Sequence, residues 1–300
     1  MPGIEGVYAA AVTPRRRASQ EIDLGAMWDL IDFLCSKKVD GIVLFGSTGE
    51  FVHFSIDERT RVIGLAVKRS RVPILVNVSH STFDGAVSLA EAAMHSGAAG
   101  LLLMPPYFFR YSQRDILAFY RKFATEVRLR VPALIYHIPI FTNDVGIDCV
   151  AELITDGPYS GFKDSSGDWA NFESLRELQA RKPFTLMIGS DGLFARARAL
   201  GASGVISGIA SAAPELLVGL RRAVDAGDTA RVQRLDARLS EIISWLDHFA
   251  VPIGVKEAVL QRGIKAGGHA IPLSADDEQK LAEYREWFRT WISDVIKECA

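Results

Sequence analysis

The sequence predicts a (β/α)₈ barrel of the TIM type, followed by a C-terminal extension of three helices. Eight short apolar runs rich in Val, Ile and Leu recur along residues 6–211. They lack the in-out alternation of half-exposed strands, so they predict buried parallel strands. Amphipathic stretches separate the runs, and eight successive strand–helix units are typical of a closed α/β barrel.

The expected strands cover residues 6–14, 41–46, 72–79, 100–106, 131–139, 159–166, 184–190 and 204–211. Apolar residues at helical spacing fill the intervals, and Ser55 with Glu58 forms a capping-box pattern. A doubly wound open sheet is the competing architecture, but it often has a glycine-rich turn after the first strand, and VTPRRR has none.

Beyond the eighth strand the pattern is helical only. We expect helices over residues 228–250, 253–266 and 275–298. The sequence therefore predicts a barrel over residues 1–227 and a helical extension over 228–300 that packs on it as part of one functional domain.

Composition excludes several classes of partner. The formal net charge of −2 provides no basic field for nucleic acid or anionic membrane, and the lone cluster Arg15–Arg16–Arg17 predicts a solvated loop. No apolar run is long enough to span a bilayer, and the N-terminus lacks a signal-peptide pattern. Cys35, Cys149 and Cys299 show no disulfide or metal-binding spacing, so a reducing cytoplasm is expected.

Lys163 is the first candidate for chemistry, because it lies inside the sixth apolar run, in SGFKDSSGD. A lysine in a buried strand loses hydration of its charge, which favours the neutral amine that can attack a carbonyl. The alternative is a structural lysine paired with Asp164 or Asp168.

Two further groups could assist such an amine. Tyr136, in the fifth run, could pass protons between substrate and solvent, or it could be an ordinary core aromatic. Its neighbour His137 should point the other way, toward the helices. The segment Gly46–Glu50 (GSTGE) offers backbone amides and two hydroxyls that could hold a carboxylate, although a plain turn is equally consistent with five residues.

Other catalytic classes lack their signatures. The six histidines show no metal-ligand spacing, GSTGE lacks the pattern of a nucleotide-phosphate loop, and no GxSxG motif is present. Amine catalysis without metal or organic cofactor remains.

Three motifs together resemble one family. GSTGE (46–50), YHIP (136–139) and GFKDSSGD (161–168) stand in order on the second, fifth and sixth expected strands. In this arrangement the chain resembles the dihydrodipicolinate synthase / N-acetylneuraminate lyase family of class I aldolases, over nearly its whole length.

The resemblance implies a role for each matched residue. Lys163 would form a Schiff base with a 2-oxo acid such as pyruvate, and Tyr136 would be the general acid/base. Thr48 would contact the tyrosine hydroxyl and, with Ser47, bind the substrate carboxylate. The remaining implied substrate-binding positions are Gly49, Ser165, Gly189, Asp191, Ile206 and Phe141. The family implies no cofactor and a homotetramer built as a dimer of dimers.

Departures from the family pattern narrow the expected substrate. Phe141 stands where the synthases carry a carboxylate-binding arginine, and Phe108 stands at the inter-subunit relay tyrosine, leaving Tyr107 or Tyr111 as substitutes. Of the sugar-binding positions of the sialate lyases, Asp191 is present but glycines occupy the others.

These departures leave three alternatives. The substitutions are closest to aldolases and dehydratases of 2-keto-3-deoxy sugar acids. The rivals are dihydrodipicolinate synthase, condensing pyruvate with aspartate semialdehyde, and a non-catalytic barrel that binds a keto acid.

Overall fold

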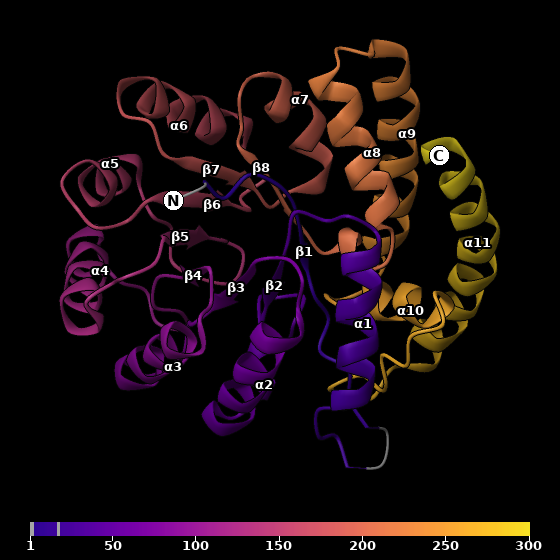
Figure 1. Cartoon of the computed structure of the whole chain (residues 1–300), viewed down its shortest axis with the longest axis horizontal. Helices are drawn as coiled ribbons and strands as arrows, with labels where there is room; N and C mark the ends of the chain where they lie inside the picture. The colour runs from indigo at the N-terminus through magenta and orange to yellow at the C-terminus, as the bar shows by residue number, and fades with distance from the viewer. Residues whose placement is uncertain (1–2, 17–18) are drawn as a thin grey trace.

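The computed structural model describes residues 3–16 and 19–300 and forms a closed barrel of eight parallel strands in sequence order (Figure 1). The strands are β1 (Gly6–Ala10), β2 (Gly41–Leu44), β3 (Ile74–Asn77), β4 (Gly100–Leu103), β5 (Ala133–His137), β6 (Gly161–Asp164), β7 (Thr185–Ile188) and β8 (Gly204–Ser207). β1 pairs with both β2 and β8, so the sheet has no free edge. The predicted fold class is confirmed.

Helices surround the barrel. They are α1 (Leu24–Ser36), α2 (Ile56–Arg69), α3 (Phe83–Ser96), α4 (Gln113–Val127), α5 (Ile147–Thr155), α6 (Trp169–Arg181), α7 (Phe194–Ala199) and α8 (Pro214–Asp225), with short 3₁₀ helices η1 (Phe51–His53), η2 (Asp191–Leu193) and η3 (Ile209–Ser211). The capping box predicted at Ser55 and Glu58 is present at the start of α2.

Three helices follow α8, as the sequence predicts: α9 (Thr229–Leu246), α10 (Ile253–Gln261) and α11 (Ala275–Cys299). Figure 1 shows them gathered on the α8 side of the barrel, with α11 outermost. In the described part of the chain, no helix is long and apolar enough to cross a membrane.

The strands are shorter than the apolar runs that predicted them. The first run was expected to extend to residue 14 but β1 ends at Ala10, although Ala11, Val12 and Thr13 are also buried. The reason is that the loops leaving the strands are themselves covered, so hydrophobicity continues past the last backbone pairing. The strand bounds were therefore wrong at their C-terminal ends.

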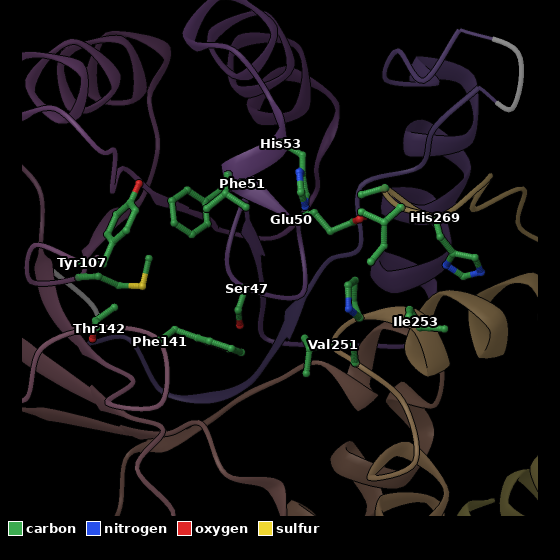
Figure 2. A pocket seen from close by; sticks show the side chains of 16 residues that line it. Ser47, Glu50, Phe51, His53, Tyr107, Phe141, Thr142, Val251, Ile253 and His269 are labelled. Atoms are coloured by element: carbon green, nitrogen blue, oxygen red, sulfur yellow. The ribbon is translucent and has the colours of Figure 1, made fainter. Parts of the chain in front are cut away.

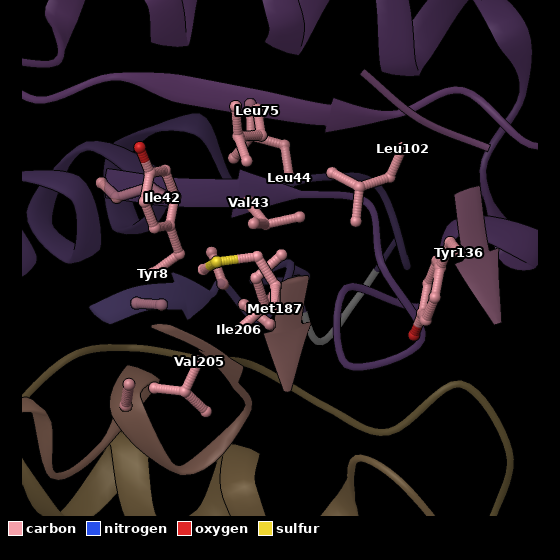
Figure 3. Packing of buried hydrophobic residues seen from close by; sticks show 14 of the residues in the cluster. Tyr8, Ile42, Val43, Leu44, Leu75, Leu102, Tyr136, Met187, Val205 and Ile206 are labelled. Atoms are coloured by element: carbon pink, nitrogen blue, oxygen red, sulfur yellow. The ribbon is translucent and has the colours of Figure 1, made fainter. Parts of the chain in front are cut away.

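The interior of the barrel is packed with apolar side chains. Figure 3 shows Met187 close to Val43 and Ile206, with Tyr136 beyond this packing at the strand ends. Gly41 is needed here, since a Cβ at this position would lie 2.1 Å from the Tyr8 ring. Because the interior is filled, a ligand of the barrel would bind at its end, and the catalytic groups of such barrels lie at the C-terminal ends of the strands.

Candidate active site

Lys163 and Tyr136 lie side by side at the C-terminal ends of β6 and β5. The parallel register pairs Tyr136 with Lys163 and His137 with Asp164. Because successive side chains alternate across a strand, the first pair faces the barrel interior and the second faces the helices. Lys163 is only 4% exposed, and its amine lies 3.9 Å from the centroid of the Tyr136 ring.

Lys163 does not form the ion pair with Asp164 or Asp168 that was the alternative to a catalytic role. Within the described residues, no carboxylate lies at ion-pair distance from its amine. Asp164 is bonded instead to His137, at 3.0 Å, and Asp168 caps α6 by accepting from the Ala170 amide. The lysine amine is therefore buried without a partner anion in contact.

The GSTGE segment brings a hydroxyl to Tyr136. Ser47 Oγ lies 3.1 Å from Tyr136 Oη. No hydrogen bond joins Thr48 to the tyrosine in the described residues; Thr48 lies near Gly208, where a Cβ would approach its Oγ1 to 2.8 Å. Sequence spacing could not decide which of two adjacent hydroxyls faces the tyrosine.

Two glycines of the predicted site make close approaches possible. A Cβ on Gly49 would lie 2.9 Å from the backbone of Phe45, so the tight GSTGE loop excludes any side chain there. A Cβ on Gly189 would lie 1.9 Å from Ser165 Oγ and 2.9 Å from Lys163 Cε. Gly189 thus leaves the space that the lysine and Ser165 occupy.

A cavity of about 270 Å³ joins these residues. Its lining includes every predicted catalytic and substrate-binding residue except Gly49, and the end of α9, the start of α10 and the segment between them form another part of its wall. The contributed residues there include Leu246, Phe249 and Val251, which sequence reasoning missed because a helical extension carries no motif.

Asp191 is the charged group that faces Lys163 in this cavity. Its Oδ1 is buried and has no hydrogen-bond partner among the described residues. Burial raises the pKa of this carboxyl to about 6, although the nearby Ser207 hydroxyl and the charge of Lys163 act in the opposite direction. A buried, unpartnered acceptor beside an amine is suited to a substrate hydroxyl or to proton transfer.

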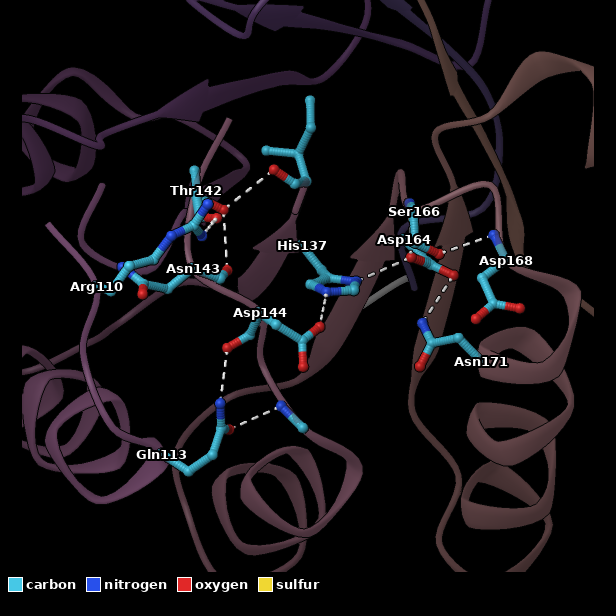
Figure 4. Close-up of polar contacts among 12 residues, drawn as sticks. Arg110, Gln113, His137, Thr142, Asn143, Asp144, Asp164, Ser166, Asp168 and Asn171 are labelled. Atoms are coloured by element: carbon cyan, nitrogen blue, oxygen red, sulfur yellow. Dashed lines mark hydrogen bonds and ion pairs between the residues drawn. The ribbon is translucent and has the colours of Figure 1, made fainter. Parts of the chain in front are cut away.

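Behind the lysine, His137 joins two strands and a loop (Figure 4). One ring nitrogen lies 3.0 Å from Asp164 Oδ1 and the other 2.8 Å from Asp144 Oδ1. Burial lowers the pKa of His137, but the two carboxylates outweigh burial and raise it above the usual value. Asp164 also accepts from the Ser166 amide and from Asn171, and its pKa is lowered despite burial. The expected placement of His137 toward the helices is confirmed.

Ion pairs of Glu50 hold the end of the GSTGE loop in place. Glu50 ends this loop in a left-handed conformation, with φ of 54°. It pairs with the fully buried Lys256 of α10 at 2.8 Å and with Arg15 at 3.7 Å. The expected solvated loop at Arg15–Arg17 was therefore wrong for Arg15, which is buried; Arg16 is exposed and Arg17 lies outside the described residues. The sequence did contain a signal for this ion pair, because Lys256 stands among the apolar residues of α10.

The aromatic loop after β4 does not complete a proton relay within the chain. Phe108 is 90% exposed, and Tyr107 is packed edge-on against Phe51, with the centroids 5.9 Å apart. In the described residues, neither Tyr107 nor Tyr111 is hydrogen-bonded to Tyr136, whose hydroxyl contacts Ser47.

Comparison with known proteins identifies the relatives of this chain. Residues 3–289 match the Dihydrodipicolinate synthetase family. A 4-hydroxy-tetrahydrodipicolinate synthase of Methanosphaerula palustris is 32% identical over 96% of this chain and 99% of its own length. An uncharacterised DapA-like lyase of Halobacterium salinarum is 31% identical over 93% of this chain and 92% of its own.

Solved structures agree. The crystal structure of dihydrodipicolinate synthase from Aquifex aeolicus has a TM-score of 0.88 at 28% identity, covering 96% of this chain and 98% of that one. YagE from E. coli K12, a prophage protein of the same family solved with pyruvate, has a TM-score of 0.89 at 25% identity, with coverages of 96% and 98%. This protein is therefore an enzyme of the dihydrodipicolinate synthetase family of lyases and class I aldolases.

Proposed function

We propose that the enzyme forms a Schiff base between Lys163 and the carbonyl carbon of a pyruvate-type 2-oxo acid. The observation that carries this proposal is the buried Lys163 amine, 3.9 Å from the Tyr136 ring centroid and free of any contacting carboxylate in the described residues. An amine buried in a cavity with no carboxylate in contact is placed to attack a carbonyl carbon that enters the cavity. The pyruvate in the YagE structure supports the same substrate class.

The proposed reaction needs no cofactor. The amine attacks C2 of the 2-oxo acid and water leaves, giving a protonated imine. Tyr136, left as the phenolate after giving its proton to the departing water, takes the proton of the C4 hydroxyl as the C3–C4 bond breaks. The C4 fragment leaves as an aldehyde, and the electron pair of the broken bond converts the imine into an enamine. Protonation at C3 and hydrolysis then release pyruvate and return the lysine.

The GSTGE loop is proposed to hold the carboxylate of the substrate. Ser47 and Thr48 line the same cavity as Lys163, and loops of this kind bind anions well through hydroxyls and backbone amides. Fixing the carboxylate orients C2 toward the amine and removes orientational freedom before the reaction. Gly189, Ser165 and Ile206 would form the wall around the imine.

We place the substrate among 4-hydroxy-2-oxo acids with an uncharged distal end, which include 2-keto-3-deoxy sugar acids. Phe141 lines the cavity and can form no charge-assisted hydrogen bond with a second carboxylate. Dihydrodipicolinate synthesis is the second candidate, because curated relatives carry that name. A non-catalytic keto-acid-binding barrel is the third, but binding alone does not require the buried lysine.

A substrate comparison tests this choice. We expect a higher kcat/KM for cleavage of 2-keto-3-deoxygluconate and related 2-oxo acids with an uncharged distal chain than for condensation of pyruvate with aspartate semialdehyde. Two lost charge-assisted bonds of ~1.5–3 kcal/mol each correspond to a deficit of roughly 10²- to 10⁴-fold for aspartate semialdehyde. Phe141→Arg should reduce this deficit, whereas Phe141→Leu should not. Aspartate semialdehyde as the best substrate would overturn the sub-assignment.

We also propose a homotetramer arranged as a dimer of dimers in the cytoplasm, with α9–α11 belonging to the same functional unit as the barrel. Phe108, Phe109 and Tyr111 are 90%, 64% and 43% exposed, and contiguous exposed aromatic surface favours an interface. The three cysteines are free thiols, consistent with a reducing compartment. A monomer by light scattering at micromolar concentration would contradict the assembly.

A further inference from the structure

A second cavity adjoins the catalytic one. We name this cavity of about 390 Å³ the distal chamber. Ser47, Phe141 and the segment 250–252 line both cavities and thus form the neck between them. Figure 2 shows the chamber framed by Phe51 and Tyr107 on one side and by Val251 and Ile253 on the other.

The walls of the distal chamber are mainly apolar. They include Phe51, Val52, Met104, Tyr107, Ile253 and Ile271. Val52 and Ile271 are 60% and 62% exposed, so they present apolar surface that a ligand could cover. Removing such surface from water is favourable in proportion to its area.

Two polar groups of the chamber, Glu50 and Thr142, are engaged elsewhere, whereas His53 and His269 also line it and His269 Nδ1 has no hydrogen-bond partner among the described residues. Glu50 is neutralised by Lys256 and Arg15, and the Thr142 hydroxyl donates to backbone carbonyls. No lysine or arginine is among the described lining residues; the basic side chains there are His53 and His269, and His269 Nε2 already lies 3.3 Å from Glu257. A polyhydroxylated chain would lose water along the apolar wall and could regain hydrogen bonds chiefly at Ser47 and the two histidines.

The neck connects the chamber to the reacting atoms. In the proposed reaction Tyr136 exchanges a proton with the C4 oxygen, and Ser47 Oγ lies 3.1 Å from the tyrosine hydroxyl. The same Ser47 lines the distal chamber. A C4 whose oxygen contacts Tyr136 therefore lies next to the neck, and its substituent can extend past Ser47 and Phe141.

We propose that the distal chamber binds an apolar C4 substituent, aryl or branched alkyl, so that the aldehyde released or captured by the enzyme is an apolar one. This inference rests on the proposed imine chemistry at Lys163 and narrows its substrate class. In the synthetic direction the enamine carbon of pyruvate bonds to the aldehyde carbon, and the aldehyde oxygen takes a proton to become the C4 hydroxyl.

The test measures aldol addition of pyruvate to benzaldehyde and to glyceraldehyde, by the 4-hydroxy-2-oxo acid formed. We expect kcat/KM to favour benzaldehyde by about tenfold or more, because the chamber removes a phenyl-sized apolar group from water. Ile271→Glu and Val52→Glu should each lower the benzaldehyde value by about tenfold while glyceraldehyde changes less than about twofold. Leu200→Glu is the matched control, since Leu200 is an exposed apolar residue outside both cavities.

Three results would overturn the inference: preference for glyceraldehyde, an equal loss for both aldehydes in the chamber variants, or a change of oligomeric state in place of selectivity. The last would mean that a second copy fills the chamber. Borohydride trapping with pyruvate alone separates this failure from that of the proposed function. If wild-type protein forms the adduct but shows the wrong aldehyde selectivity, only the chamber assignment fails; without the adduct, the imine proposal fails.

Discussion

Asp191→Asn should stabilise the protein at neutral pH while impairing its activity. The Asp191 Oδ1 is buried without a hydrogen-bond partner in the described residues, and burial raises the pKa of the carboxyl from 3.8 to about 6. The folded state therefore holds the proton more tightly than the unfolded state does. The resulting destabilisation is absent below about pH 4, grows between about pH 4 and 6, and is complete above about pH 6.

The size of the effect follows from the same values. A difference between 3.8 and about 6 corresponds to at most ~3 kcal/mol of unfolding free energy at pH 7. An asparagine amide cannot ionise, so we expect a gain of ~1–3 kcal/mol at pH 7 and little gain at pH 4. Loss of kcat/KM with any 2-oxo acid substrate should accompany the gain, because the carboxylate faces Lys163.

Urea unfolding followed by circular dichroism at pH 4 and pH 7 checks this prediction. Asp148→Asn provides the control, since Asp148 is exposed at the start of α5 and its replacement should give no such pH-dependent gain. The reasoning would be refuted if the difference in unfolding free energy between Asp191→Asn and wild type were the same at both pH values, or if the variant were less stable than wild type at pH 7.

Three further predictions concern the surroundings of Lys163. Gly189→Ala should lower kcat/KM at least about tenfold, because its methyl group would lie 2.9 Å from Lys163 Cε. Gly192→Ala is the control, since a Cβ at that position meets no close atom and should leave kcat/KM nearly unchanged. Full activity of Gly189→Ala would contradict the prediction. His137→Asn should reduce the unfolding free energy most near pH 6. The difference from wild type should shrink as pH rises through the raised pKa of His137, because wild type then loses the charge that favours folding. A difference that grows toward pH 9 in urea unfolding would contradict this prediction. EDTA should leave activity intact, since the described residues contain no metal-binding cluster of His, Cys, Asp or Glu; loss reversed by a divalent ion would argue otherwise.

The sequence predicted the barrel because each strand run and each helix carries its own local signal. Lys163 and Tyr136 could be predicted as candidates because a polar residue in a buried strand is conspicuous. Their contact could not be predicted from spacing, since it depends on the β5–β6 register that pairs them. The ends of the strands were also hidden, because buried loops continue the apolar pattern beyond β1 and β8.

Contacts between distant segments were the least predictable part of the site. Glu50 and Lys256 are 206 residues apart in sequence, and nothing local to either shows that they meet. Ser47 hydrogen-bonds Tyr136 from a loop bounded by left-handed residues at Phe45 and Glu50, and sequence spacing specifies neither these backbone conformations nor the hydroxyl that faces the tyrosine. The cavity wall at Leu246–Val255 depends on how α9 and α10 pack, which hydrophobic periodicity does not specify.

Covalent trapping of pyruvate tests the central claim most directly. Borohydride reduces an imine to a stable secondary amine, so treatment of the enzyme with pyruvate and borohydride should leave one adduct per chain. Peptide mapping should place that adduct on Lys163, and Lys163→Ala should form none and lose activity. An unmodified Lys163 after this treatment, or a fully active Lys163→Ala enzyme, would contradict the account.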